Sequence, residues 1–133
     1  MMMTNINWWA IVAATVSAFV LGGVWYAPAV FGKLWLRETG VDINHKKSHS
    51  ITVFVSAFVL ALVGAIAFGL LLGPRPSLGF ALGMALVVGI CWIGTSFAVN
   101  YLFAGRSFKL FFVDAGYHTV QFVLYGIILG LWH

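Results

Sequence analysis

FKLFFVDAGYHTVQFVLYGIILGLW, residues Phe108–Trp132, is the last of four long apolar runs in this chain. At 3.6 residues per turn, one stripe of a helix through this run carries Asp114, His118, Gln121 and Tyr125. The run is long enough to cross a bilayer, where an ionised aspartate near the centre costs about 2.5–3.5 kcal/mol on insertion scales. Because hydrocarbon is a poor environment for an acid and an imidazole, we expect this stripe to face protein and not lipid.

The composition of the whole chain is strongly apolar. Hydrophobic residues make up 62% of the 133 residues and charged residues 8%, whereas a typical soluble domain is about 25% charged. Seven Lys and Arg residues against three acidic residues give a formal net charge of +4. In so apolar a chain this excess indicates membrane orientation and lipid-headgroup contact, and not nucleic-acid binding. The single cysteine, Cys91, excludes an intramolecular disulfide and a metal site built from several cysteines, and we expect no cofactor.

The apolar runs predict an all-α membrane protein, a four-transmembrane-helix bundle that forms a single domain over residues 1–133. About 20 residues cross a hydrocarbon core of about 30 Å, and each run is near this length. We predict transmembrane helices over residues 7–26, 50–72, 77–103 and 108–132, and a short interfacial amphipathic helix over residues 29–40. The turn Gly73–Pro76 predicts a tight antiparallel hairpin of the second and third helices, and Ser107 is the predicted N-cap of the last one.

Two of the predicted helices carry a small residue at every fourth position. In lipid, helices associate through close backbone contact and dispersion, so these stripes indicate packing faces and offer contacts for a homo-oligomer. The stripes are Ala10, Ala14, Ala18 and Gly22 in the first helix and Ala57, Ala61, Ala65 and Gly69 in the second.

Basic residues are distributed unevenly between the two ends of the predicted bundle. Six belong to the loops at one end, and Arg75 is alone at the other: the six are Lys33, Arg37, Lys46, Lys47, Arg106 and Lys109. Because cytoplasmic loops carry an excess of Lys and Arg, the six-residue end is predicted to face the cytoplasm. The sequence therefore predicts a multi-pass protein of the inner (cytoplasmic) membrane with both termini on the non-cytoplasmic side.

Several local strings of this sequence resemble those of a known family. The strings are Asn5, Asn7–Trp8, Gly22–Pro28, Phe31–Trp35, Trp92, Lys109–Phe111, Asp114–His118 and Gly130–Trp132. Over nearly its whole length the chain resembles the bacterial integral membrane family catalogued as domain of unknown function 1761. This resemblance implies a four-helix integral membrane protein and brings no established activity.

Asp114 and His118 are the main candidates for a functional role. At positions i and i+4 of a helix in a low dielectric, the carboxylate can hydrogen-bond the imidazole as an ion pair or as a neutral pair. One interpretation is a proton relay, a cation site or a substrate anchor, which Gln121 and Tyr125 would extend. The other is a polar clamp between helices, with Asn100 as the expected partner of the carboxylate. The sequence leaves both interpretations open.

A second group of polar residues lies in the loop before the second helix. Asp42, His45 and His49 have a spacing that could place three metal ligands on one side of a helix. Lys46 and Lys47 interrupt this set and no fourth ligand is evident, so we expect a solvated segment without a bound metal. The chain has no Gly-x-Ser-x-Gly motif, and we do not expect it to be an enzyme; an intramembrane enzyme is the last alternative.

Two functions from different classes follow from these observations. The first is a transporter, a channel-like protein or a small-ligand-binding homo-oligomer, in which the polar stripe of the last helix lines a pathway between protomers. The second is a structural or accessory membrane module. In that function the polar residues fix helix packing, and the protein binds lipid or a partner membrane protein.

Overall fold

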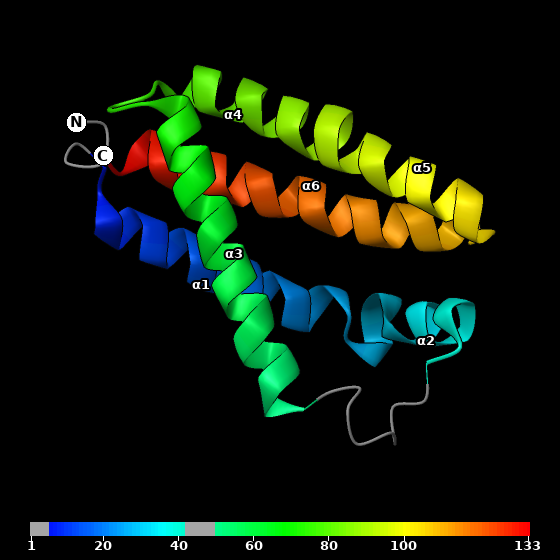
Figure 1. The fold of residues 1–133 in the computed structure, drawn as a ribbon. Helices are drawn as coiled ribbons and strands as arrows, with labels where there is room; N and C mark the ends of the chain where they lie inside the picture. Colours follow the sequence, from blue (N-terminus) through cyan, green and yellow to red (C-terminus); the bar gives the residue numbers. More distant parts are fainter. Residues whose placement is uncertain (1–5, 42–49) are drawn as a thin grey trace.

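The computed structural model describes residues 6–41 and 50–133 (Figure 1). Its elements in chain order are α1 (Trp8–Trp25), a π-helical turn (Pro28–Gly32), α2 (Lys33–Thr39), α3 (Ile51–Leu72), α4 (Leu78–Leu86), a π-helical segment (Val87–Gly94), α5 (Thr95–Ala104) and α6 (Phe108–Leu131). Four helices are long and apolar enough to cross a membrane: α1, α3, the continuous segment Leu78–Ala104 and α6. The predicted all-α fold with four helices of membrane-spanning length is confirmed.

A polar side chain caps the N-terminus of each of these four helices. The side-chain oxygens of Asn7, Ser50, Ser77 and Ser107 accept hydrogen bonds of 3.1–3.4 Å from backbone N–H groups three residues further on. These bonds satisfy donors that have no partner inside the first turn of a helix. The predicted N-cap at Ser107 is confirmed.

α6 lies between α1 on one side and α4 on the other (Figure 1). The contact between α4 and α6 depends on two glycines, because a Cβ at Gly126 would lie 2.9 Å from the carbonyl oxygen of Ala81. A Cβ at Gly130 would lie 3.0 Å from Cα of Leu78. We call this contact of Leu78 and Ala81 with Gly126 and Gly130 the α4–α6 seam. The backbones of α4 and α6 approach more closely here than a residue larger than glycine at position 126 or 130 would allow.

α3 departs from the predicted hairpin. Figure 1 shows α3 diverging from α4 after the turn and crossing α1 and α6 with its C-terminal half. The physical reason is the α4–α6 seam, which gives α4 a closer backbone neighbour than α3 offers.

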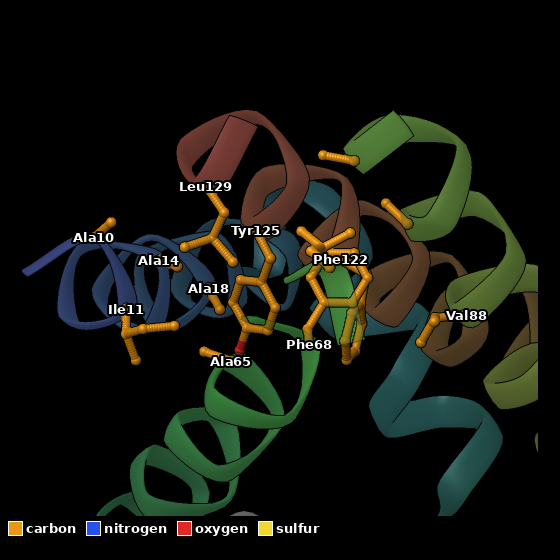
Figure 2. Close-up of a cluster of buried hydrophobic side chains, with 13 residues drawn as sticks. Ala10, Ile11, Ala14, Ala18, Ala65, Phe68, Val88, Phe122, Tyr125 and Leu129 are labelled. Carbon is orange, nitrogen blue, oxygen red and sulfur yellow. The ribbon is translucent and has the colours of Figure 1, made fainter. Parts of the chain in front are cut away.

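The apolar core lies where α3 crosses α1 and α6, as Figure 2 shows. The rings of Phe68 from α3 and Phe122 from α6 pack edge to face with centroids 5.3 Å apart. Tyr125 of α6 is completely buried and extends toward α3. On α1, three members of the first small-residue stripe are completely buried: Ala10, Ala14 and Ala18.

The rest of the two stripes divides between the interior and the surface. Gly22 faces the Tyr117 hydroxyl, which would lie 3.4 Å from a Cβ at that position. On α3, Ala65 and Gly69 are buried, Ala61 is half-buried and Ala57 is exposed. The stripe of α1 is therefore occupied by contacts within the protomer, while the beginning of α3 presents apolar side chains outward.

Two hydrogen bonds mark the two ends of the bundle. At one end, Asn7 Nδ2 donates to the carbonyl of Trp132 over 3.4 Å, beside the turn that joins α3 and α4. At the other end, Arg106 Nη1 donates to the carbonyl of Thr39 over 3.3 Å and joins the loop before α6 to the end of α2. The described basic residues Lys33, Arg37, Arg106 and Lys109 belong to this second end, which we call the basic end, and Arg75 belongs to the first (Figure 1).

Candidate functional site

Asp114 on α6 is buried with 8% of its surface exposed, and two tyrosine hydroxyls bind its carboxylate. Tyr26, directly after α1, donates to Oδ1 over 2.7 Å. Tyr101 on α5 donates to Oδ2 in a short hydrogen bond. Because each oxygen receives a donor from a different helix end, the carboxylate joins α1, α5 and α6.

The turn after α1 places the Tyr26 ring. The indole Nε1 of the preceding Trp25 donates to the carbonyl of Val113 over 2.9 Å and holds the end of α1 against α6. The π-helical turn then folds back so tightly that a Cβ at Gly32 would lie 2.3 Å from the carbonyl oxygen of Tyr26. Burial, and then the Asp114 carboxylate, raise the pKa of Tyr26 well above its ordinary value. Tyr26 therefore stays protonated and keeps its role as a donor.

His118 begins a second polar network, which is separate from that of Asp114. Its Nδ1 lies 2.7 Å from Oε1 of Gln121. Gln121 Nε2 donates to the Tyr125 hydroxyl over 2.7 Å, and that hydroxyl donates to the carbonyl of Ala61 on α3 over 2.8 Å. We call this series of hydrogen bonds the His118–Ala61 chain.

The carbonyl at the end of the chain fixes the direction of every bond in it. A carbonyl can only accept, so Tyr125 donates to Ala61 and must accept from the amide nitrogen of Gln121. The amide oxygen of Gln121 then faces His118, whose Nδ1 must carry the proton. Neutral His118 therefore has its free lone pair on Nε2.

The surroundings of His118 leave Nε2 accessible. The imidazole stacks on Phe97 of α5, with ring centroids 5.3 Å apart and an interplanar angle of 24°. Tyr117 lies edge-on, with centroids 4.9 Å apart. Every buried side-chain nitrogen or oxygen among residues 6–41 and 50–133 has a hydrogen-bond partner. Nε2 of His118 has no partner among these residues, so it is not one of the buried atoms. Nε2 therefore reaches the surface of the molecule.

The structure pairs the predicted polar residues differently from the sequence analysis. Asp114 does not bind His118, because the hydroxyls of Tyr26 and Tyr101 occupy both oxygens of its carboxylate. Asp114 thus extends toward the basic end, where Tyr26 and Tyr101 lie, and His118 binds Gln121 one turn further on. Asn100 is exposed and makes no hydrogen bond to Asp114; the neighbouring Tyr101 occupies the role that we predicted for it.

Three aromatic residues of the site were missed by the sequence analysis: Tyr26, Phe97 and Tyr101. Tyr26 belongs to the Gly22–Pro28 string of the family resemblance, which was the available signal for it. Tyr101 and Phe97 resemble ordinary packing aromatics of an apolar helix, and no pattern in one sequence distinguishes them. Asp42, His45 and His49, the weak metal candidates, lie outside the described residues.

These contacts limit the chemistry that the site can perform. Both oxygens of Asp114 are bound by fixed donors, which suits a clamp between helices. The His118–Ala61 chain passes through an amide and ends on a carbonyl, so it positions His118 and does not conduct protons onward. The group that remains free to accept a proton or a hydrogen bond is Nε2 of His118.

Together, four helices of membrane-spanning length and these two internal polar networks define a small multi-pass membrane protein with ionisable groups inside its spans. The chain belongs to the family described as protein of unknown function (DUF1761), whose model matches residues 9–130. The predicted resemblance to this family is thereby confirmed. A search of curated proteins and a search of solved structures each gave no match to this chain.

Proposed function

We propose that this protein is a transport protein of the bacterial cytoplasmic membrane in which His118 takes up a proton, or the hydrogen bond of a small substrate. The observation that carries this proposal is the direction of the His118–Ala61 chain, which leaves the lone pair on the accessible Nε2. His118 lies about 15 Å along α6 from Phe108 at 1.5 Å per residue, about the middle of a hydrocarbon core of about 30 Å. Ionisable residues at that depth in a membrane protein mark substrate or ion pathways and proton relays, which supports a role in transport.

The proposed orientation rests on the basic end. Lys33, Arg37, Arg106 and Lys109 lie in the two loops that the Arg106–Thr39 hydrogen bond joins. An end with this excess of cations belongs on the cytoplasmic side, so both termini lie on the opposite side.

The proposed working form is a homo-oligomer. The three alanines of the α1 stripe are buried within the protomer, but the first half of α3 is largely exposed, including Val55, Ala57, Val59 and Leu60. A second copy packed on this half of α3 would enclose the side of the bundle that α3 leaves uncovered. A pathway between protomers needs less internal space than four helices would have to provide.

Proton flux into reconstituted vesicles tests this proposal. Vesicles with a trapped pH-sensitive dye receive an imposed pH gradient and membrane potential, and wild-type protein is expected to accelerate the pH change inside. His118→Gln should abolish this acceleration while the protein keeps its elution volume and melting temperature. His133→Gln, the same substitution at an exposed histidine, serves as the matched control and should transport like the wild type. Equal flux through wild type and His118→Gln, or no flux through wild type, would contradict the uptake of a proton by His118.

A structural or accessory module is the second candidate, and the Asp114 contacts support it. Two hydroxyls from different helices bind the carboxylate, as expected of a group that fixes packing. This function predicts that Asp114→Asn weakens the fold and that the purified protein retains a partner membrane protein, while wild-type vesicles show no flux. Flux that survives in a correctly folded Asp114→Asn protein, with no retained partner, would contradict this second function.

A further inference from the structure

An apolar groove of about 550 Å³ lies on another face of α6 from Asp114 and His118. Small residues of α5 and α6 line it, among them Ala98, Ala115 and Gly116. The aromatic side chains of Trp25 and Phe112 also line it. The groove is therefore separate from both polar networks.

The polar side chains in the groove are already bonded to their own helices. The Thr95 hydroxyl donates to the carbonyls of Cys91 and Trp92 at 2.6 and 3.0 Å. The Thr119 hydroxyl donates to the carbonyl of Ala115 at 2.9 Å. Both threonines thus present methyl groups, and the groove has no donor to offer a polar ligand. Its occupant must be a hydrocarbon surface.

The length of the groove distinguishes between a lipid chain and another helix. Along α6 the lining extends from Phe111 to Val120, which is about 14 Å at 1.5 Å per residue. This is about half of a hydrocarbon core of about 30 Å, the depth of one leaflet. A transmembrane helix of a second copy that packed parallel to α6 would need contact over the whole core. An acyl chain fits one leaflet.

The charge at the mouth of the groove indicates the headgroup. The groove begins at the basic end, where Lys109 is exposed one helical turn before Phe112 on the same side of α6. Arg106 is exposed in the same loop. The acidic side chains described near this end are already engaged: Glu38 lies 3.8 Å from Arg37, and Asp114 is bound by the tyrosines.

From the groove, its length and this charge we propose a lipid site: one acyl chain of an anionic phospholipid occupies the groove, and its phosphate meets Lys109. The lipid lies in the leaflet at the basic end. The site does not depend on the function proposed for His118.

Native mass spectrometry of the delipidated protein, with added phosphatidylglycerol or phosphatidylcholine of the same chains, tests this site. Ala98→Phe and Thr95→Phe each fill the groove from α5 without changing α6, and each should lose most of the bound phosphatidylglycerol. Ala67→Phe, on the exposed side of α3, is the matched control and should bind like the wild type. Circular dichroism and melting temperature identify a variant that has misfolded. If one of the two groove variants misfolds, lipid binding by the other one tests the site.

The charge is tested in the same experiment. Lys109→Gln should lower the preference for phosphatidylglycerol over phosphatidylcholine about fivefold, the effect of one cation near an anionic headgroup. Arg75→Gln, at the opposite end of the bundle, should leave that preference unchanged. Groove-filling variants that bind lipid like the wild type would overturn the proposal. So would variants that dissociate an oligomer while lipid binding persists, because the groove would then hold a helix of a second copy.

Discussion

The hydroxyl of Tyr26 donates a 2.7 Å hydrogen bond to Oδ1 of Asp114 and so joins the end of the first span to the last one. Tyr101 binds the other carboxylate oxygen from the third span. An acid that is costly in hydrocarbon thus becomes the common acceptor of two helices that its own helix separates. Asp114 belongs to the architecture, and His118, one turn further along, is the residue with a free nitrogen.

Removal of the Tyr26 hydroxyl should destabilise the fold clearly. Tyr26→Phe leaves one oxygen of a buried carboxylate without its donor, so we expect a loss of about 1.5–3 kcal/mol in the free energy of unfolding. Tyr117→Phe is the matched control, because its hydroxyl donates over 3.0 Å to the neutral carbonyl of Ala18, and a loss of about 0.6 kcal/mol is expected there. Unfolding in mixed detergent micelles measures both values. Equal losses in the two variants would contradict the prediction that a hydrogen bond to the buried carboxylate stabilises the fold more than one to a backbone carbonyl.

Stability should fall at alkaline pH, partly through Tyr26. Its pKa is raised in the folded protein by burial and by Asp114, whereas in the unfolded chain it is near the ordinary 10.0. The stabilisation is fully present below pH 10 and is lost as the pH rises above it, because the unfolded state then releases a proton that the folded state retains. The slope contributed by one such proton is about 1.4 kcal/mol per pH unit. The free energy of unfolding, measured between pH 8 and 11, should fall less steeply with pH in Tyr26→Phe, by the contribution of one proton. Identical slopes in the two proteins would contradict the assignment of this proton to Tyr26.

The tautomer of His118 can be observed directly. The direction of the His118–Ala61 chain predicts a proton on Nδ1 of the neutral imidazole, which ¹⁵N NMR of the labelled protein reports by chemical shift. Tyr125→Phe removes the group that orients the Gln121 amide, so the Nε2–H tautomer should increase. Tyr117→Phe, which touches the ring without joining the chain, should keep the wild-type tautomer. A wild-type protein that carries its proton on Nε2 would disprove the direction of the chain.

The α4–α6 seam predicts opposite effects for two glycine-to-alanine changes. In Gly126→Ala the new Cβ meets the carbonyl oxygen of Ala81 at 2.9 Å, and the shift that it forces should cost about 1–3 kcal/mol of stability. In Gly83→Ala the Cβ enters open space, and the better helix propensity of alanine should leave stability unchanged or raise it by up to about 1 kcal/mol. Melting temperatures of the two variants in detergent check this difference. A Gly126→Ala protein as stable as the wild type would show that the seam can widen without cost.

The spans were accessible from sequence, because run length and composition alone decide whether a segment can cross hydrocarbon. Of the polar stripe that we expected to face protein, Asp114, Gln121 and Tyr125 are buried, whereas His118 is half-buried. The partners of the polar residues were not accessible from sequence. Helical spacing places Asp114 and His118 on one stripe, but it does not tell which neighbouring helix supplies a donor. The choice between Asn100 and Tyr101 is a rotation of about 100° on α5, and a single apolar sequence does not fix that rotation. Tyr26 depends on a π-helical turn whose geometry no periodicity predicts.

The crossing of α3 has a mechanical consequence. The α4–α6 seam is a contact between backbones, so these two helices behave as a rigid frame. The buried residues of α3 lie in its second half, which ends at the turn of Gly73, where φ is positive. The hydrogen bond from Tyr125 to the carbonyl of Ala61 joins the middle of α3 to α6. If a tilt of α3 broke this bond, the Gln121 amide would lose the group that orients it, and the proton on His118 would no longer be held on Nδ1.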